Sequence, residues 1–372
     1  MDPDVPYLYD RSGEKYPVDA PRWRGNDGTP LMVSALRGIG RDDIEDRERS
    51  QWRYEAALPY HLREKITLGE GCTPLLPCHI NGADVFVKPE WFNPTSSFKD
   101  RGTTVMLSAL KDQGIIRVLE DSSGNGGSSV AAYAAAGSMK AKVLVPASTS
   151  PAKIVQSRRH GAEIELVPGV RQDTADEAVR QSGSIFYSSH NWHPFFLQGT
   201  KLIAYEIWEG LGFTAPDSVV VPAGAGSLVL GCSIGFGELL RAGQIDKMPR
   251  ILAVQPENCS PIAKAFAAGS PVPVDGAWKH SFAEGASIAH PVRGPEVLAA
   301  VTGSAGAIIT VTEDQIRAAT DELALKGLYA EPTSAMAGAA VPAFMDRGLI
   351  RTGEKTVLVL TGSALKATAI TE

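Results

Sequence analysis

The sequence predicts an α/β fold in which a mostly parallel sheet is covered by helices. Short apolar runs that do not alternate with polar residues recur along the chain, as they do in strands buried on both faces. Segments with helical spacing separate these runs, and strands that alternate with helices are typical of α/β proteins. The clearest apolar runs lie at 143–145, 218–221, 251–254 and 357–360.

One predicted helix has both of its ends marked. Thr312 and Gln315 have the spacing of a capping box, and Gly327 is placed to end the helix. Between them, Ile316, Ala319 and Leu323 share one face. We also expect a strand over 115–119 and a helix of small residues over 129–136.

The first sixty or so residues carry many prolines, glycines and charges. We expect an extended arm or lid over 7–31, and the charged run at 41–49 is typical of a solvated helix face.

Length and charge limit the possible functions. At roughly 100–200 residues per domain, a chain of 372 residues is expected to form two domains. With 36 Lys and Arg against 42 Asp and Glu, its formal charge of −6 argues against nucleic acid as the main partner. No apolar stretch is long enough for a membrane helix, and the acidic start does not look like a secretory signal. The four cysteines form no CxxC pair, which favours a reduced, cytoplasmic protein.

The first motif with chemical potential is the segment Asn93–Gly102. Its Pro, Thr and Ser residues favour a loop, and Ser97 could cap a helix that begins near Lys99. A lysine is most often an ordinary surface residue. Here Phe98 and several hydroxyls surround it, and a partly buried lysine of lowered pKa can form a Schiff base with a carbonyl.

Three further loops follow apolar runs, where ligands bind in open α/β sheets. Residues 122–128 could be a plain glycine turn or an anion cradle in which Asn125 faces a ring or carbonyl oxygen. Residues 224–227 could be a structural turn or a phosphate cradle, although they lack the dinucleotide spacing. At 361–366, Thr361 could cap a helix or bind a heterocyclic nitrogen.

These four segments, in this order, resemble the threonine synthase family of pyridoxal-phosphate enzymes, of the tryptophan-synthase-β type (fold type II). The resemblance runs from about Tyr54 to Lys366. It implies two open, twisted, mostly parallel sheets covered by helices, with pyridoxal 5'-phosphate in the cleft between a larger and a smaller domain. We expect an N-terminal arm (1–63), a larger cofactor domain (64–102 and 199–372) and a smaller mobile domain (103–198). Four further segments carry the resemblance: 66–75, 198–201, 283–285 and 331–334.

The resemblance implies a role for each matching residue. Lys99 matches the lysine that forms the Schiff base, Phe98 lies where the family packs the cofactor, and Asn125 matches the partner of the 3'-oxygen of the ring. Thr361 matches the hydroxyl near the pyridine nitrogen, and a hydroxyl there gives a weaker electron sink than a carboxylate. The expected phosphate-binding loop is Gly224, Ala225, Gly226, Ser227 and Leu228, and the expected substrate-binding residues are Ser97, Ser122, Ser123, Ser128, Lys153 and Arg158.

Departures from the family pattern keep several reactions open. The family commonly has Gly at the position of Ser96 and His at that of Ser363. Many relatives begin with a cysteine-rich zinc ribbon, whereas residues 7–31 have no cysteine, and the histidines lack metal-ligand spacing. We therefore expect no metal. Arg101 and Arg159 are further candidates to bind the phosphate of O-phosphohomoserine, although surface exposure is the commoner role of such residues.

The leading prediction is a pyridoxal-phosphate-dependent lyase that converts O-phospho-L-homoserine and water to L-threonine and phosphate. The alternative is an ammonia-lyase, dehydratase or β-replacement enzyme acting on a hydroxy-, sulfur- or amino-substituted amino acid. A non-catalytic binder and a nicotinamide oxidoreductase are the remaining classes. The expected partners are an amino-acid substrate and a second copy of the chain in a homodimer, without nucleic acid or membrane.

Overall fold

A computed structural model of the chain describes residues 5–366, and these residues fall into two compact units. Unit 1 contains the chain up to Leu36 together with Glu45–Glu70 and Asn93–Thr200. Unit 2 contains Arg37–Ile44, Gly71–Phe92 and the chain from Lys201 onward. The domain boundary that the sequence suggested after residue 102 falls inside the first long helix, which runs unbroken in unit 1.

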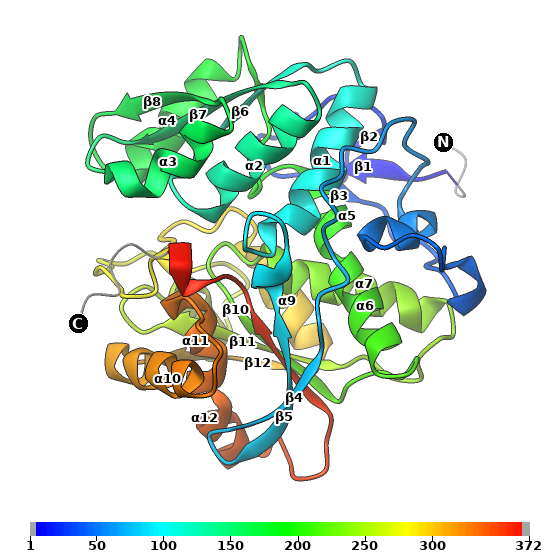
Figure 1. Ribbon diagram of the computed structural model, residues 1–372, viewed down its shortest axis with the longest axis vertical. Helices are drawn as coiled ribbons and strands as arrows, with labels where there is room; N and C mark the ends of the chain where they lie inside the picture. The colour runs from blue at the N-terminus through cyan, green and yellow to red at the C-terminus, as the bar shows by residue number, and fades with distance from the viewer. Residues whose placement is uncertain (1–4, 367–372) are drawn as a thin grey trace. The chain divides into compact units, whose positions relative to one another are not determined.

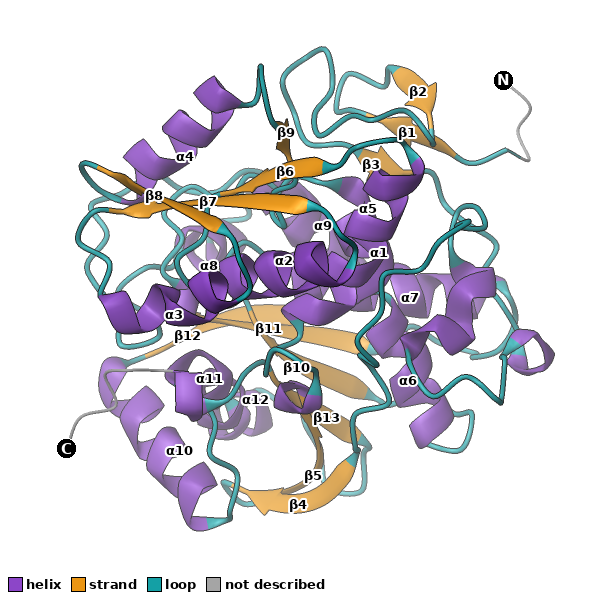
Figure 2. Cartoon of the chain, turned by 45° about the horizontal axis from the view of Figure 1, so that its top comes forward, coloured by secondary structure: helices purple, strands orange, loops and turns teal. Residues whose placement is uncertain are grey.

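Unit 1 is built on a parallel four-stranded sheet with the strand order β8-β7-β6-β9. The helix α4 lies on one face of this sheet, and α2 and α3 lie on the other (Figure 2). Apolar side chains of the strands pack under α4, among them Leu119 and Leu144. The elements are α1 (Lys99–Asp112), β6 (Arg117–Glu120), α2 (Asn125–Ala136), β7 (Lys140–Pro146), α3 (Pro151–Arg159), β8 (Glu163–Val167), α4 (Arg171–Gln181), β9 (Phe186–Tyr187) and α5 (Pro194–Thr200).

The start of unit 1 forms a small sheet, whereas we expected an extended arm or lid over 7–31. Three short strands form an antiparallel sheet with the order β2-β1-β3. A buried hydrogen bond of 2.5 Å from Tyr16 Oη to Asp10 Oδ2 holds its turns together. The elements of this part are β1 (Tyr7–Tyr9), β2 (Lys15–Pro17), β3 (Met32–Val33) and the 3-10 helix η2 (Gln51–Ala57).

Unit 2 is built on a six-stranded sheet with the order β12-β11-β10-β13-β5-β4, in which only β4 runs antiparallel to its neighbour. In Figure 1, α10, α11 and α12 lie on one side of these strands and α6 and α7 lie on the other. The strands are β4 (Leu76–Ile80), β5 (Ala83–Pro89), β10 (Ser218–Pro222), β11 (Arg250–Pro256), β12 (Ala307–Val311) and β13 (Thr356–Leu360). The helices are η1 (Arg41–Asp43), η3 (Glu90–Phe92), α6 (Leu202–Gly210), α7 (Ser227–Arg241), α8 (Pro261–Ala267), η4 (Glu284–Ala286), α9 (Gly294–Gly303), α10 (Glu313–Leu325), α11 (Pro332–Ala339), α12 (Val341–Asp346) and η5 (Ala364–Lys366).

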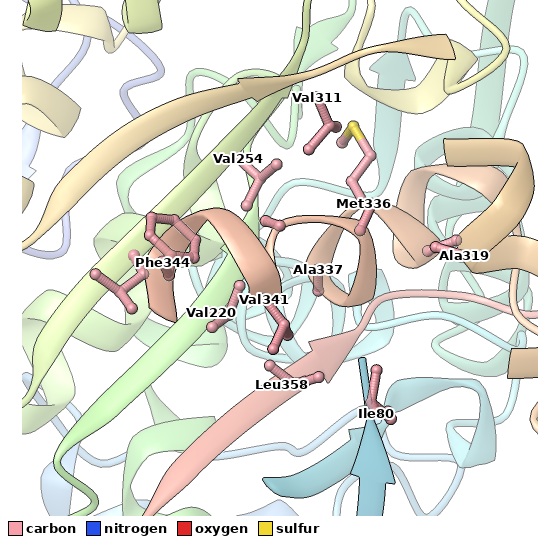
Figure 3. Packing of buried hydrophobic residues seen from close by; sticks show 14 of the residues in the cluster. Ile80, Val220, Val254, Val311, Ala319, Met336, Ala337, Val341, Phe344 and Leu358 are labelled. Carbon is pink, nitrogen blue, oxygen red and sulfur yellow. The ribbon is translucent and has the colours of Figure 1, made fainter. Parts of the chain in front are cut away.

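The core of unit 2 joins the sheet to helices from distant parts of the sequence. Val220 and Leu358 of neighbouring strands pack with Met336 of α11 and Phe344 of α12 (Figure 3). These side chains are fully buried, and burying each such side chain contributes roughly 1.5–3 kcal/mol before the cost of chain ordering. This packing fixes the carboxyl ends of β10 and β13, from which two of the candidate loops emerge.

Most of the elements predicted from the sequence are confirmed. The four apolar runs belong to β7, β10, β11 and β13. The helix expected from Thr312 is α10, with the predicted capping box, and Gly327 follows it in the left-handed region at φ +79°. Two further expectations were wrong: the run at 41–49 forms only the short η1, and α2 begins at Asn125, four residues earlier than expected. Within residues 5–366, no helix is both long and apolar enough to cross a membrane.

Candidate functional site

Lys99 is the first residue of α1, at the end of a tight loop. Its side chain is half-buried, and Nζ lies 4.4 Å from the ring centroid of Phe98 and 5.7 Å from that of Phe196. Phe196 is fixed because it also packs on Gly102, where a Cβ atom would come within 2.5 Å of the ring. The amine of Lys99 is therefore held against two aromatic rings, which favours a defined position.

The loop before Lys99 is braced by the next residue, Asp100. Asp100 is fully buried and its carboxylate accepts hydrogen bonds from Thr95 N at 2.6 Å and from Thr95 Oγ1 at 2.5 Å. Ser129 Oγ of α2 donates to the same carboxylate at 2.6 Å and also contacts Thr103 Oγ1 at 2.8 Å. Hydrogen bonds to a carboxylate are the stronger kind, so this network fixes the start of α1 to α2.

Asn125 is the first residue of α2 and follows the carboxyl end of β6. The turn before it is very tight, because a Cβ atom on Gly127 would lie 2.0 Å from the carbonyl oxygen of Ser122. Ser122 Oγ accepts a hydrogen bond from the amide of Gly124, and Ser128 Oγ donates one to the carbonyl of Asn125. The first amides of a helix have no intrahelical acceptor, so this loop presents backbone donors beside the Asn125 amide.

A buried carboxyl–imidazole pair lies directly behind this loop. His190 Nδ1 is 2.8 Å from Glu120 Oε1, and the amide of His190 donates to Glu120 Oε2 at 3.3 Å. Burial raises the pKa of Glu120 to about 7, and burial also holds the pKa of His190 well below its ordinary value. The imidazole fits closely under the turn, since a Cβ atom on Gly126 would lie 2.7 Å from its Cε1.

In unit 2, residues 223–226 connect β10 to the 15-residue helix α7, whose first two residues are Ser227 and Leu228. Gly226 is in the left-handed region at φ +88°, which glycine adopts without strain. A Cβ atom on Gly224 would lie 2.8 Å from the carbonyl oxygen of Gly285. Gln255 supports the loop, because its Nε2 donates to the carbonyl of Ala223 at 3.1 Å. A small-residue loop that opens a long helix has the donors and the dipole that bind an anion.

Thr361 follows the carboxyl end of β13 and is buried. Its Oγ1 donates to Glu331 Oε1 at 3.2 Å and lies 2.9 Å from Ser334 Oγ. Ser334 Oγ also accepts from the amide of Gly362 at 2.8 Å. Because the hydroxyl proton of Thr361 is directed to a carboxylate, a lone pair of its oxygen remains for a donor such as a protonated ring nitrogen.

The proposed substrate residues are distributed over several elements of unit 1. Ser97 does not cap α1 with its side chain as we expected, and its Oγ is buried without a hydrogen-bond partner among residues 5–366. Lys153 is in the first turn of α3, whereas the exposed Arg158 is in its last turn. Arg101 is fully buried. Ser123 is partly exposed in the loop between β6 and α2.

The two serines that depart from the family pattern have clear structural settings. Ser96 is in the left-handed region at φ +63°, where glycine is the less strained residue. Ser363 is buried, and its Oγ accepts a hydrogen bond from the amide of Leu365 at 3.2 Å. Ser96 therefore keeps a glycine-like backbone, and Ser363 holds the last short helix.

Sequence reasoning missed the partners of the candidate residues. Glu331 and Ser334 reach Thr361 because residues 330 and 363 form a β-bridge, which local spacing does not predict. Glu120 and His190 are 70 residues apart and meet because β9 pairs with β6. The acidic Glu120-Asp121 pair at the end of an apolar strand was the available signal. Unit 1 thus carries the amine of Lys99 and the amide of Asn125. Unit 2 carries the small-residue loop at 224–228 and the hydroxyl of Thr361.

The chain is similar to known proteins over most of its length. Residues 66–362 match the family described as "Pyridoxal-phosphate dependent enzyme". A threonine synthase of Methanocaldococcus jannaschii is 33% identical over 338 residues, covering 88% of this chain and 83% of that protein. A threonine synthase of Methanosarcina acetivorans is 34% identical, with the same coverage of 88% and 83%. A fungal L-serine ammonia-lyase from Rhizomucor miehei has a similar fold, with a TM-score of 0.69 at 20% identity over 81% of this chain and 95% of that chain.

Proposed function

This chain belongs to the family of pyridoxal-phosphate-dependent enzymes, and we propose that it catalyses the threonine synthase reaction. In this reaction O-phospho-L-homoserine and water give L-threonine and phosphate. The observation that carries the proposal is the position of Lys99, an amine in the first turn of α1 packed against Phe98. The threonine synthases at 33% and 34% identity support the same reaction.

The residues of the chain fit pyridoxal phosphate chemically. The loop around Gly224 has no room for a Cβ atom and opens a long helix, as a phosphate site requires. The hydroxyl of Thr361 has an acceptor lone pair for a ring nitrogen, and Asn125 has an amide for a ring oxygen. We propose that Phe98 and Lys99, together with Asn125, 224–228 and Thr361, hold the cofactor.

The bound cofactor supplies an electron sink for a carbanion at the substrate Cα. Nζ of Lys99 would take the proton from Cα and return protons to the substrate during the reaction. The backbone amides at 224–228 would bind the cofactor phosphate, and the hydroxyl of Thr361 would orient the ring. A hydroxyl holds a ring proton less firmly than a carboxylate does, which suits elimination and replacement at the β or γ carbon.

The substrate itself has two anionic groups that need partners. We propose that Ser97, Ser122, Ser123 and Ser128 bind its carboxylate through hydroxyls and nearby amides. The buried Ser97 Oγ, which has no hydrogen-bond partner among residues 5–366, is suited to such a role. Lys153 and Arg158 are the proposed partners of the substrate phosphate, and the first-turn position of Lys153 makes it the stronger candidate.

The alternative reaction is ammonia-lyase, dehydratase or β-replacement chemistry on a hydroxy-, sulfur- or amino-substituted amino acid. Ser96 and Ser363 favour it, because both lie beside proposed cofactor residues and depart from the family pattern. A substrate panel separates the two proposals. Phosphate release with threonine formation from O-phosphohomoserine supports the first. Keto-acid formation from serine, threonine or hydroxyaspartate, without phosphate release from O-phosphohomoserine, supports the second and excludes the first.

We further propose that the chain acts as a cytoplasmic homodimer. Its four cysteines are all free, which suits a reducing compartment. Analytical ultracentrifugation of the holoenzyme should give twice the mass of 39.5 kDa, and a monomer at micromolar concentration would contradict the dimer.

A further inference from the structure

Glu120 and His190 form a buried pair that the proposed reaction does not use. Glu120 is fully buried at the carboxyl end of β6, and His190 is nearly as buried in the segment after β9. Both carboxylate oxygens of Glu120 contact His190, one at Nδ1 and one at the amide. Burying an ionisable pair to this extent costs folding free energy. A function at the adjacent loops would explain why the protein retains the pair.

Contacts lead from this pair to Asn125 and to Lys99. On one side, the imidazole of His190 occupies the space beneath Gly126, the residue after Asn125. On the other side, the ring of His190 lies 5.7 Å from the ring of Phe196 in an edge-to-face arrangement. Phe196 in turn lies 5.7 Å from Lys99 Nζ. The pair is therefore close to both residues that unit 1 offers to the cofactor.

We propose that Glu120 and His190 are positioning residues of this site: His190 supports the turn that carries Asn125, and the charge of Glu120 sets how readily Lys99 Nζ loses its proton. This inference rests on the proposed function, because it assigns the pair a role at the proposed cofactor site. The electrostatic coupling between Glu120 and Lys99 can be measured without cofactor.

The electrostatic part has a definite sign. Burial is the main cause that raises the pKa of Glu120 to about 7, and the positive charges of Arg171 and Lys99 act against this rise. The coupling between two ionisable groups is reciprocal. Because the charge of Lys99 lowers the pKa of Glu120, the negative charge of Glu120 must in turn stabilise the ammonium form of Lys99. Other charged groups face the pair: Arg171 of α4 is ion-paired with Asp121 at 2.7 Å, and Tyr187 of β9 donates to Asp121 at 2.7 Å. The opposite charges of Arg171 and Asp121 largely cancel each other. The carboxyl group of Glu120 is therefore the group near Lys99 whose charge changes with pH.

The first experiment measures the rate at which apoprotein captures added pyridoxal phosphate, as a function of pH. Capture forms a C=N bond between Lys99 Nζ and the aldehyde carbon and releases water, and only the unprotonated amine has the lone pair for it. Glu120→Gln removes the negative charge and keeps the shape, so the midpoint of the profile should move to lower pH by about 0.5 unit or more. Glu165→Gln is the matched control, because Glu165 lies on β8 of the same sheet, two strands away from β6, and pairs with Lys142. Its profile should coincide with that of the wild type.

A second experiment needs no Glu120 variant and no cofactor. The ring Cε1–H signal of His190, one of seven histidines, reports protonation of the pair by NMR and is assigned with His190→Gln. Lys99→Gln removes the cation that disfavours protonation, so the midpoint of the pair should rise in pH relative to the wild-type apoprotein.

The outcomes separate the two proposals. A wild-type protein that captures no cofactor contradicts the proposed function, while the NMR comparison still decides the coupling. Capture by the wild type with superimposable profiles for wild type and Glu120→Gln overturns this inference and leaves the proposed function intact. If Glu120→Gln does not fold, equal NMR midpoints in wild type and Lys99→Gln overturn the inference in the same way.

Discussion

Ser129 Oγ donates a hydrogen bond of 2.6 Å to Asp100 Oδ1 and thereby ties α2 to α1 one residue after Lys99 and one helical turn after Asn125. Both helices start at a candidate site residue, so a displacement of either helix would separate the amine from the amide. The fully buried position of Asp100 strengthens the bond, because little water competes for its carboxylate.

Asp100→Asn should lower the free energy of unfolding by about 2 kcal/mol. The substitution replaces hydrogen bonds to a charged carboxylate with bonds to a neutral amide. It also turns the amide NH2 group toward one of the donors that now bind the carboxylate. Urea unfolding of the apoprotein measures the change. Asp112→Asn at the other end of α1 is the control, and it should cost less than about 1 kcal/mol because that carboxylate pairs with the exposed Arg63. Equal effects of the two substitutions would show that the Asp100 network does not stabilise the fold specifically.

Lys99→Ala should remove covalent cofactor attachment and reduce kcat by about 10³-fold or more, because Lys99 supplies the amine and the proposed base. Borohydride reduction followed by peptide mapping should place the cofactor on Lys99 in the wild type. Lys111→Ala, on the same helix, should leave the adduct and the activity unchanged. An adduct on a different lysine would refute the assignment of Lys99.

Gly224→Ala should weaken pyridoxal phosphate binding by about tenfold or more, because the new Cβ would press on the carbonyl of Gly285 and displace the loop amides. Pyridoxal without its phosphate should lose much less affinity. Absorbance titration measures both ligands. Gly237→Ala within α7 meets only ordinary contacts and serves as the control. Equal losses for the two ligands would speak against a phosphate cradle at this loop.

Thr361→Val should reduce kcat by about tenfold to a hundredfold while the protein still binds cofactor, because valine keeps the volume of threonine and removes the hydroxyl that contacts Glu331 and Ser334. Thr361→Ser restores the hydroxyl and should recover activity to within about fivefold of the wild type. Steady-state kinetics of both variants provide the measurement, and failure of serine to rescue would exclude the hydroxyl as the essential group.

The Glu120–His190 pair should make the fold sensitive to acid. In the folded state the pair holds one proton, on Glu120, because its pKa is raised to about 7 while the pKa of His190 is held well below its ordinary value. In the unfolded chain His190 is protonated below its ordinary pKa of about 6.5, and Glu120 takes a second proton below about 4.5. Below about pH 4.5 the unfolded state therefore binds one proton more, and stability falls as the pH falls, by about 1.4 kcal/mol per pH unit.

His190→Gln removes the second proton site, so this part of the acid sensitivity should disappear in the variant. Chemical denaturation of wild type and variant between pH 3.5 and 6 compares the slopes, and the other carboxylates contribute equally to both proteins. Parallel slopes would contradict the assignment of the proton to Glu120.

Local sequence patterns were sufficient for several of the strands and helices and for the family. Continuous apolar runs such as 357–360 have to be buried on both faces, so they predicted strands of a parallel sheet. The capping box at Thr312 satisfies amides within one helical turn, and for that reason it can be recognised in a short window. The motif around Lys99 and the glycine loops identified the family because the chemistry requires particular residue types at short spacing.

Contacts between distant segments could not be predicted in this way. Residues 7–31 look irregular in sequence, yet they form a sheet that is closed by Tyr16 and Asp10. The start of α2 at Asn125 was missed because Gly126 and Gly127 are poor helix formers. Tertiary packing requires them, since larger residues would meet His190 and the carbonyl of Ser122.

By itself the sequence determined the α/β class, the strands β6, β7, β10, β11 and β13 with the helix α10, and the lysine, asparagine, glycine-loop and threonine segments. It did so because hydrophobic periodicity, capping and turn chemistry act over a few residues. Only the tertiary structure decided that Glu120 meets His190, that Glu331 meets Thr361 and that Asp100 joins two helices. Strand pairing and helix packing bring these groups together, and burial then gives them pKa values and hydrogen bonds that no short window of sequence contains.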